Sequence, residues 1–332
     1  MRSTALSVSL ILAPFCASAD MVDNILDQQI LPGMETLAST SASLALAAKA
    51  DCRSNSSIMR RAYDDAFDAW ISVSHFRFGP TETDNRAFAL SFWPDSRGKI
   101  PKALSALVRN QDPIINSPKE FATASIAARG FYAMDYLLYN SEVTGARTAE
   151  YRCYLFHAIT ADIANTAQLI HNDWQTNYAE KLRSSGDRYR SEAEVKQELY
   201  KALNTGLQVT ADMRLGRPLG TFDNPRPKRA EARRSGRSQH HVALSLQALE
   251  PLAVALSADN VELVDKFRVA FAKAHKAVER LDDPIFASVK DPAGRFRVEA
   301  LQQLMNDIRA IADTELGPSL GVDPGFNSLD GD

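Results

Sequence analysis

Apolar residues recur at intervals of three and four along almost the whole chain, whereas the alternation typical of strands is nearly absent. The segment 56–78 shows this pattern clearly. Its apolar stripe consists of Met59, Ala62, Tyr63, Ala66, Phe67, Trp70, Val73 and Ser74. Arg60, Asp64 and Asp68 fall largely outside the stripe, so this helix is expected to bury one face. Gly79-Pro80 should end it, because proline disfavours helical geometry in the preceding residue. The pattern predicts an all-α fold.

The same periodicity predicts further helices. They cover residues 22–50, 100–110, 118–139, 147–182, 190–215, 239–258, 259–282 and 292–315. Pro32-Gly33 is a candidate break in the first of them. Residues 79–98 and 216–236 lack helical periodicity, and loops of this length are uncommon unless they serve a function. A chain of 332 residues exceeds the size at which single cores usually stop growing. Two domains are therefore expected, 20–145 and 146–332.

The first 19 residues are typical of a secretory signal peptide. Arg2 supplies the positive charge, residues 5–14 are an apolar run, and Ala17-Ser18-Ala19 is a small-residue cleavage site. Cleavage is predicted after Ala19. A lipid anchor at Cys16 is disfavoured by the bulky residues before it. No later stretch approaches the roughly 20 apolar residues of a membrane helix, so the mature protein is expected in the periplasm without a transmembrane segment.

Charge and cysteine content narrow the alternatives further. The chain has 38 basic and 41 acidic residues, a formal net charge of -3, and so lacks the positive field expected of a nucleic-acid-binding protein. After export, Cys52 and Cys153 are the two remaining cysteines. An even count in an oxidising compartment favours a disulfide between them. The alternative is a pair of buried free thiols.

Several short motifs, in order, resemble the landmarks of the imelysin-like family. They are Ala69-Trp70, residues 76–80 (FRFGP), 92–95 (FWPD), 129–139 (RGFYAMDYLLY), 215–220 (LGRPLG), 230–235 (AEARRS) with Ser238, and 325–332 (GFNSLDGD). The resemblance covers essentially the whole mature chain. It implies an exported, all-helical protein of two related bundle-like domains associated with iron uptake. Members of this family were named as peptidases.

The family's signature G-x-H-x-x-E corresponds here to residues 130–135, which read GFYAMD. Tyr132 thus replaces the histidine and Asp135 the glutamate. Residues three apart share one helix face, so Tyr132 and Asp135 can still converge. Together with Glu231 they form a candidate oxygen-donor site for ferric iron, since hard oxygen donors suit it better than zinc. The alternative is a structural hydrogen-bonding pair at a bundle interface.

Residues 214–237 form a basic segment within an acidic protein. They contain eight basic and two acidic residues. Arginines on a loop are suited to binding carboxylate or phosphate groups through paired hydrogen bonds. Arg233, Arg234, Ser235 and Ser238 are the candidate ligand-binding residues for an anion such as an iron chelate. The alternative is a solvated loop. His240-His241 follows the loop, and adjacent helical residues point about 100° apart, so joint chelation by the pair is not expected.

The chain contains neither H-E-x-x-H nor G-x-S-x-G, so no catalytic residue is assigned. The leading hypothesis is a periplasmic protein that binds iron, or an anionic ligand carrying it, between two helical domains. One alternative is a metal-dependent peptidase, as the family name implies. Another is a scaffold that binds an envelope protein partner and whose inherited site has decayed.

Overall fold

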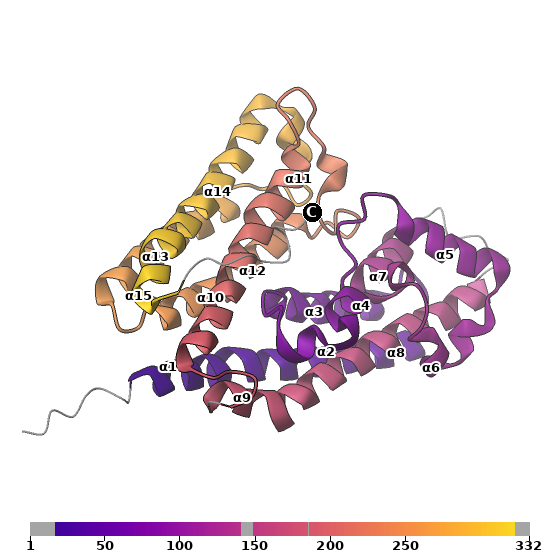
Figure 1. The fold of residues 1–332 in the computed structure, drawn as a ribbon. Coiled ribbons are helices and arrows are strands. Elements are labelled where there is room, and N and C mark those ends of the chain that lie inside the picture. The colour runs from indigo at the N-terminus through magenta and orange to yellow at the C-terminus, as the bar shows by residue number, and fades with distance from the viewer. Residues whose placement is uncertain (1–16, 141–148, 185, 323–332) are drawn as a thin grey trace, which may run out of the picture.

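The computed structural model describes residues 17–140, 149–184 and 186–322 (Figure 1). Fifteen α-helices lie in these ranges. They are α1 Ala17–Ile25, α2 Leu31–Ala50, α3 Ser57–Val73, α4 Arg86–Leu90, α5 Lys99–Asn110, α6 Pro118–Phe121, α7 Gly130–Tyr139, α8 Ala149–Asp173, α9 Ala179–Arg183, α10 Glu192–Gln208, α11 Gly216–Leu219, α12 Ser238–Leu256, α13 Val261–Glu279, α14 Pro292–Ile311 and α15 Gly317–Leu320. The described residues form no strand beyond one isolated bridge, Thr221 to Asn224. The all-α prediction is confirmed.

The helices form two groups in space. Helices α2, α3 and α8 pack side by side, and α7 packs against α3 and α8. In the second half of the chain α13 packs between α12 and α14, and α10 contacts both α12 and α14. Contact between α3 and α12 joins the two groups (Figure 1). The expected domain boundary near residue 145 and nearly all of the expected signal peptide lie outside the described residues.

Amphipathic patterning explains how α3 packs. The predicted stripe is buried at Met59, Tyr63, Phe67, Trp70 and Val73, so hydrophobic burial on one face orients the helix. Its N-terminus is capped by Ser56, whose hydroxyl accepts a hydrogen bond from the backbone N–H of Met59 at 3.3 Å. The helix ends at Val73, five residues before the predicted position, and the chain then leaves the helix through Ser74 and His75.

The predicted break at Pro32-Gly33 is wrong, because the helix runs on from α1 into α2. A π-helical segment, Leu26–Ile30, precedes Pro32, and Leu31 N–H donates to Leu26 O. In this π-helical turn each N–H bonds to the carbonyl five residues earlier instead of four. The hydrogen-bond pattern therefore shifts just before Pro32, which has no N–H to donate. A similar π segment, Val209–Leu215, joins α10 to α11. The expected loop therefore starts at Gly220 rather than at residue 216.

The single helix predicted over 118–139 is also wrong. The segment divides into α6, a 3-10 turn at Ile126–Ala128, and α7. Arg129 is extended, and Gly130 has a φ of +73°. A Cβ atom on Gly130 would lie 2.2 Å from Leu90 O, so the close approach of the C-terminal end of α4 overrides the local helical pattern.

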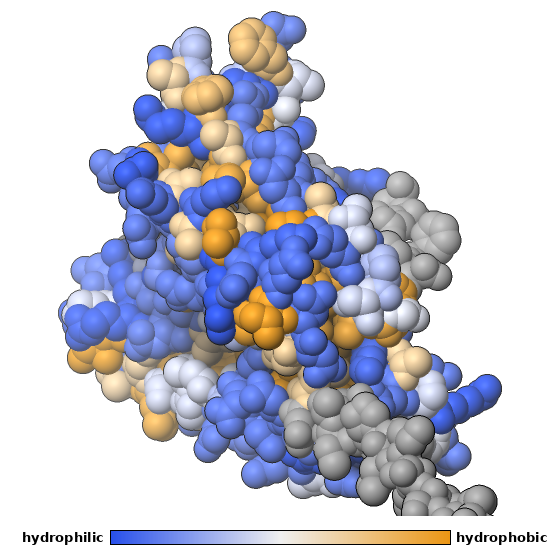
Figure 2. Space-filling model, turned by 90° about the vertical axis from the view of Figure 1, so that its left-hand side faces the viewer, coloured by the Kyte–Doolittle hydropathy of each residue, from blue (hydrophilic) through white to orange (hydrophobic). Residues whose placement is uncertain are grey.

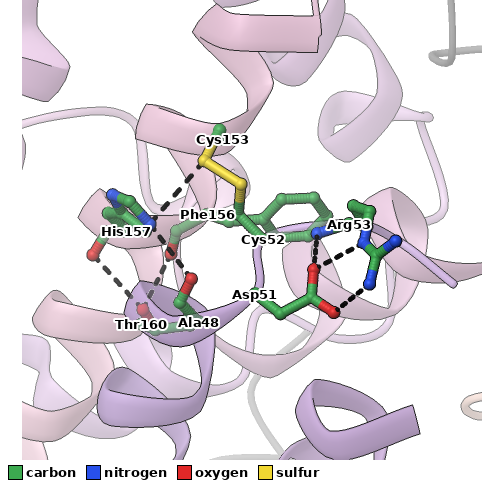
Figure 3. The surroundings of a disulfide bond; sticks show 8 residues. All are labelled: Ala48, Asp51, Cys52, Arg53, Cys153, Phe156, His157 and Thr160. Carbon is green, nitrogen blue, oxygen red and sulfur yellow. Dashed lines mark hydrogen bonds and ion pairs between the residues drawn. A yellow bond between two sulfur atoms is a disulfide. The ribbon is translucent and has the colours of Figure 1, made fainter. Parts of the chain in front are cut away.

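Cys52 and Cys153 form a disulfide (Figure 3). It links Cys52, the second residue after the end of α2, to the first turns of α8, and the two Cα atoms are 5.1 Å apart. Beside it, His157 Nε2 lies 3.0 Å from Ala48 O, which further ties α8 to α2. The predicted disulfide is therefore confirmed, and the alternative of two free thiols is wrong.

The face of the molecule drawn in Figure 2 is mostly hydrophilic. Figure 2 shows one face on which apolar side chains are scattered among polar ones. Scattered apolar residues of this kind are ordinary on a folded protein. Among the described helices, none combines the length and the apolar character needed to cross a bilayer.

Candidate functional site

Helix α7 carries the two motif residues, and the whole helix is buried from Gly130 to Leu138. Tyr132 and Asp135 lie on the α7 face that meets the segment between α11 and α12. Because only glycine tolerates the positive φ and the backbone contact at position 130, this residue sets where α7 begins. The glycine of the signature thus has a positioning role.

Tyr132 belongs to a buried network centred on Glu231. The Tyr132 hydroxyl donates to Glu231 Oε1 at 2.5 Å, and Arg214 Nε donates to Glu231 Oε2 at 2.8 Å. His241 Nδ1 lies 3.1 Å from the same Oε2. Arg214 Nη1 also donates to Ser245 Oγ at 3.0 Å. Four separate elements, α7, the π segment after α10, the loop and α12, therefore meet at one carboxylate.

The charges within the network balance one another. Burial opposes ionisation of Glu231, but the Arg214 charge and the hydrogen bonds from His241 and Tyr132 outweigh it and lower the pKa of this carboxyl. Burial, and then the Glu231 charge, raise the pKa of Tyr132 well above its ordinary value. Burial lowers the pKa of His241. At neutral pH the site is thus an arginine–glutamate ion pair with a neutral phenol and a neutral imidazole.

Asp135 lies in a different environment from Glu231. Its Oδ1 accepts a hydrogen bond from Ser235 N at 3.2 Å, and burial raises its pKa. The hydroxyls of the two candidate serines are used within the protein. Ser235 Oγ donates to Ala232 O at 2.9 Å, and Ser238 Oγ donates to Glu231 O at 2.5 Å. Both serines hold the loop in place, and neither lines the cavity that Arg233 and Arg234 line.

A basic cavity of about 240 Å³ lies between the loop and the α5–α7 region. We call it the basic pocket. Five cationic side chains line it: Arg217, Lys228, Arg229, Arg233 and Arg234. They face two carboxylates, Asp95 and Asp135. Asp95 is already engaged, because it accepts hydrogen bonds from the first backbone N–H groups of α5. Burial, and then a neighbouring arginine, lower the pKa of Arg217 and of Arg233.

The other basic residues of the segment have separate roles. Arg214 is buried against Glu231, and Arg237 pairs with Asp64 and Asp68 of α3. Arg226 is exposed and lies outside the basic pocket. His240 and His241 diverge, as expected, since His240 contacts Asp68 and His241 contacts Glu231.

The three residues expected to hold a metal are only partly brought together. Tyr132 and Glu231 are hydrogen-bonded, and Tyr132 and Asp135 line the same cavity. A cation at Glu231 would have to displace Arg214 and His241 and deprotonate Tyr132, so these groups do not fit a metal ion as they stand. Among the described residues, one group of three histidine, cysteine or carboxylate side chains has its ligand atoms close enough to hold a metal ion, all within 4.8 Å of one another. It consists of Cys52, Cys153 and His157. Its two sulfurs are bonded to each other and offer no thiolate.

Sequence reasoning did not connect Arg214 or His241 with Glu231, and it left His75 and Trp93 out of the site. Arg214 did carry a signal. It follows Leu207, Thr210 and Ala211 at helical spacing, and all three are buried. A charged residue on a buried stripe requires a compensating partner. Trp93 lies in the 92–95 motif, which did not indicate its role, and His75 and His241 gave no comparable pattern.

These observations define an all-α protein with a buried ion-pair network and a basic pocket where its two groups of helices meet. The Imelysin family profile matches residues 30–312, and the chain belongs to the imelysin family. No curated protein matches it.

Two solved structures share the fold. An imelysin-like protein from Psychrobacter arcticum 273-4 superimposes with a TM-score of 0.75 at 17% identity, covering 93% of this chain and 97% of that one. A protein from Parabacteroides distasonis ATCC 8503, described as a "putative iron-regulated protein A precursor", gives a TM-score of 0.71 at 13% identity, covering 89% and 94%. At these identities the likeness concerns the fold alone.

Proposed function

We propose that this protein is an exported binding protein that holds an anionic, iron-carrying ligand in the basic pocket. The observation that carries the proposal is the convergence of five cationic side chains on one cavity of about 240 Å³. Guanidinium groups bind carboxylate or phosphate oxygens through paired, charge-assisted hydrogen bonds. The two carboxylates in the pocket do not balance the five cations, so an anion would complete the site.

The chemistry at Glu231 favours a chelate over a bare ion. Arg214 already supplies the positive charge that a metal would bring to this carboxylate, and the Tyr132 phenol is held protonated. Iron would therefore arrive already bound to an anionic carrier. The name of the Parabacteroides distasonis protein, which mentions iron regulation, supports iron as the cargo.

The expected signal peptide and the Cys52–Cys153 disulfide support a periplasmic location, because disulfides persist in oxidising compartments. Fractionation of cells that express the full chain tests this part. Recovery of a processed, disulfide-bonded protein in the periplasmic fraction is expected, and an unprocessed cytoplasmic protein would contradict it.

Titration calorimetry of the mature, untagged protein tests the binding. Ferric citrate, citrate alone and zinc chloride are the three probes. Ferric citrate should bind, and binding should weaken from low to high salt, because the Debye length falls from about 10 Å at 0.1 M to about 3 Å at 1 M. Arg233→Ala should raise the Kd for ferric citrate about tenfold, the value of one charge-assisted hydrogen bond.

The matched control is Arg226→Ala, which removes the same charge from the same loop outside the basic pocket. It should leave the Kd nearly unchanged at moderate salt. If both variants weakened ferric citrate binding equally, the overall charge of the loop and not a specific site would be responsible. That result would contradict the proposal. Zinc binding in the wild type that is lost in Glu231→Gln would instead place a metal at the Glu231 network and overturn the proposal.

A further inference from the structure

Asp135 differs from the other acidic residue of the basic pocket, because one of its oxygens is not used within the protein. Among the described residues, Asp135 has one hydrogen-bond donor, Ser235 N at 3.2 Å from Oδ1, and no ion pair. Asp95, in contrast, accepts a backbone hydrogen bond on each of its two oxygens. Asp135 is therefore the carboxylate of the pocket that is available to a bound molecule.

The free oxygen of Asp135 is accessible from the basic pocket. The residue lines this pocket and is 3% exposed. Its Oδ2 atom accepts no hydrogen bond from a described residue, yet it does not belong to the fully enclosed polar atoms that lack a partner. The small accessible surface of Asp135 thus includes Oδ2. An oxygen in this position requires a donor, because a carboxylate left without one loses the hydrogen bonds that water would supply.

Two guanidinium groups act on Asp135 without pairing with it. Burial raises the pKa of Asp135, and the hydrogen bond from Ser235 and the charges of Arg234 and Arg233 oppose that rise. Arg234 is held beside α7, because its guanidinium carbon lies 4.6 Å from the ring centre of Tyr136, the residue after Asp135. A ligand that occupies the space between these groups would place acidic groups at the arginines and a hydrogen-bond donor at Asp135.

The charge of the pocket identifies the donor as a hydroxyl group rather than an ammonium group. Five cationic side chains face two carboxylates in the basic pocket, so a further positive charge would be repelled. A hydroxyl group carries no charge and donates to an ionised carboxylate. It also accepts a hydrogen bond from a protonated carboxyl group, so it matches Asp135 in either state.

We infer that the basic pocket selects small hydroxycarboxylic acids, whose carboxylates bind the arginines and whose hydroxyl group donates a hydrogen bond to Asp135 Oδ2. The inference rests on the anion-binding role proposed above, and it names the group that distinguishes one anion from another. Carboxylates are hard oxygen donors that suit ferric iron, so this ligand class is compatible with the proposed cargo. Asp135 is the specificity-determining residue.

Citrate and tricarballylate are the test probes, because these tricarboxylic acids differ only in the hydroxyl group on the central carbon of citrate. Titration calorimetry of the mature, untagged protein gives both Kd values. Iron is left out, so that the hydroxyl group keeps its proton. Citrate should bind with a Kd about tenfold lower than tricarballylate, the value of one hydrogen bond to a charged group. Equal Kd values would overturn the inference.

Malate and aspartate test the charge of the donor, since aspartate carries an ammonium group where malate carries its hydroxyl group. Malate should bind more tightly than aspartate, because the cations of the basic pocket repel the ammonium group. Tighter binding of aspartate would overturn the assignment of a hydroxyl donor.

Variants assign the preference for citrate to Asp135. Asp135→Leu keeps the branched shape of the side chain without its oxygens, and should make the Kd values of citrate and tricarballylate equal. Asp135→Ala serves the same purpose if the leucine variant does not fold. Asp95→Asn is the matched control, because it removes the same charge from the same pocket. It should shift both Kd values together and preserve the tenfold ratio. A preference for citrate that persists in Asp135→Leu would refute the role of Asp135.

The outcomes separate this inference from the proposed function. If neither ferric citrate nor any of the free acids bound, the anion-binding role itself would be contradicted. If ferric citrate bound and the pocket showed no preference for citrate over tricarballylate, or bound neither free acid, the anion-binding role would stand and the selection of hydroxycarboxylic acids would be overturned.

Discussion

Arg214 Nε lies 2.8 Å from Glu231 Oε2, and the two side chains are 6% and 2% exposed. They are 17 residues apart in sequence, on a π-helical segment and on the following loop. Each charge is compensated by the other in an environment that would not tolerate either alone. This ion pair anchors the loop that supplies four of the five cations of the basic pocket.

Arg214→Met should therefore destabilise the protein strongly, because it leaves the Glu231 carboxylate buried without its counter-ion. The expected loss is about 3 to 5 kcal/mol of unfolding free energy, measured by urea denaturation. The double variant Arg214→Met/Glu231→Gln removes both charges and should recover much of that loss. If the unfolding free energy of Arg214→Met lay within about 1 kcal/mol of the wild-type value, the ion pair would not contribute as a buried pair is expected to.

Tyr132→Phe should cost about 1 to 3 kcal/mol of unfolding free energy, because Glu231 Oε1 loses a buried donor. The ring contacts with Trp93 and with Phe67, at 5.2 Å, should persist. Since the pKa of Tyr132 is raised, the wild-type protein mixed with ferric citrate should show no visible tyrosinate-to-iron absorption band. Such a band, if present in the wild type and lost in Tyr132→Phe, would make Tyr132 an iron ligand.

Removal of the disulfide through Cys52→Ala/Cys153→Ala should destabilise the protein by about 4 to 5 kcal/mol in the chain-entropy model, before changes in packing. The bridge spans a sequence separation of 101 residues, so it removes much of the unfolded chain's freedom. Chemical denaturation measures the loss. Reduced wild-type protein should match the double variant, and equal stability of the oxidised wild type and the variant would contradict the entropic argument.

The depressed pKa of His75 predicts a dependence of stability on pH. His75 stays neutral in the folded protein down to about pH 3, whereas in the unfolded chain it takes up a proton near its ordinary value of 6.5. The unfolded state thus binds more protons between these values, so stability falls as the pH is lowered through this range. From pH 7 to pH 5 the expected contribution of His75 is about 2 kcal/mol.

Urea denaturation of the wild type and His75→Phe at both pH values measures this contribution. The variant should lose less stability on acidification. Above pH 8, where His75 is almost fully deprotonated in both states, the two proteins should show the same slope of unfolding free energy against pH. Identical slopes below pH 6.5 would contradict a neutral, buried His75.

The sequence by itself determined the helical class, the buried face of α3 and the family, because these depend on local periodicity and on short motifs. Pairing of Cys52 with Cys153 was favoured as well, since removal of the predicted signal peptide would leave two cysteines. The convergence of Tyr132 with Glu231 was predicted through the family's motif rather than from spacing.

Only the tertiary structure decided what the individual polar groups do. The eight basic residues lie in one continuous segment of the sequence, yet packing gives them four different roles. Arg214 is a buried counter-ion, Arg237 pairs with α3, Arg226 is exposed, and the other five surround a cavity. Gly130 broke a segment with a helical pattern because the C-terminal end of α4 lies against its backbone. Helical periodicity specifies which face of an element is buried, whereas a polar side chain's partner depends on which distant element packs there.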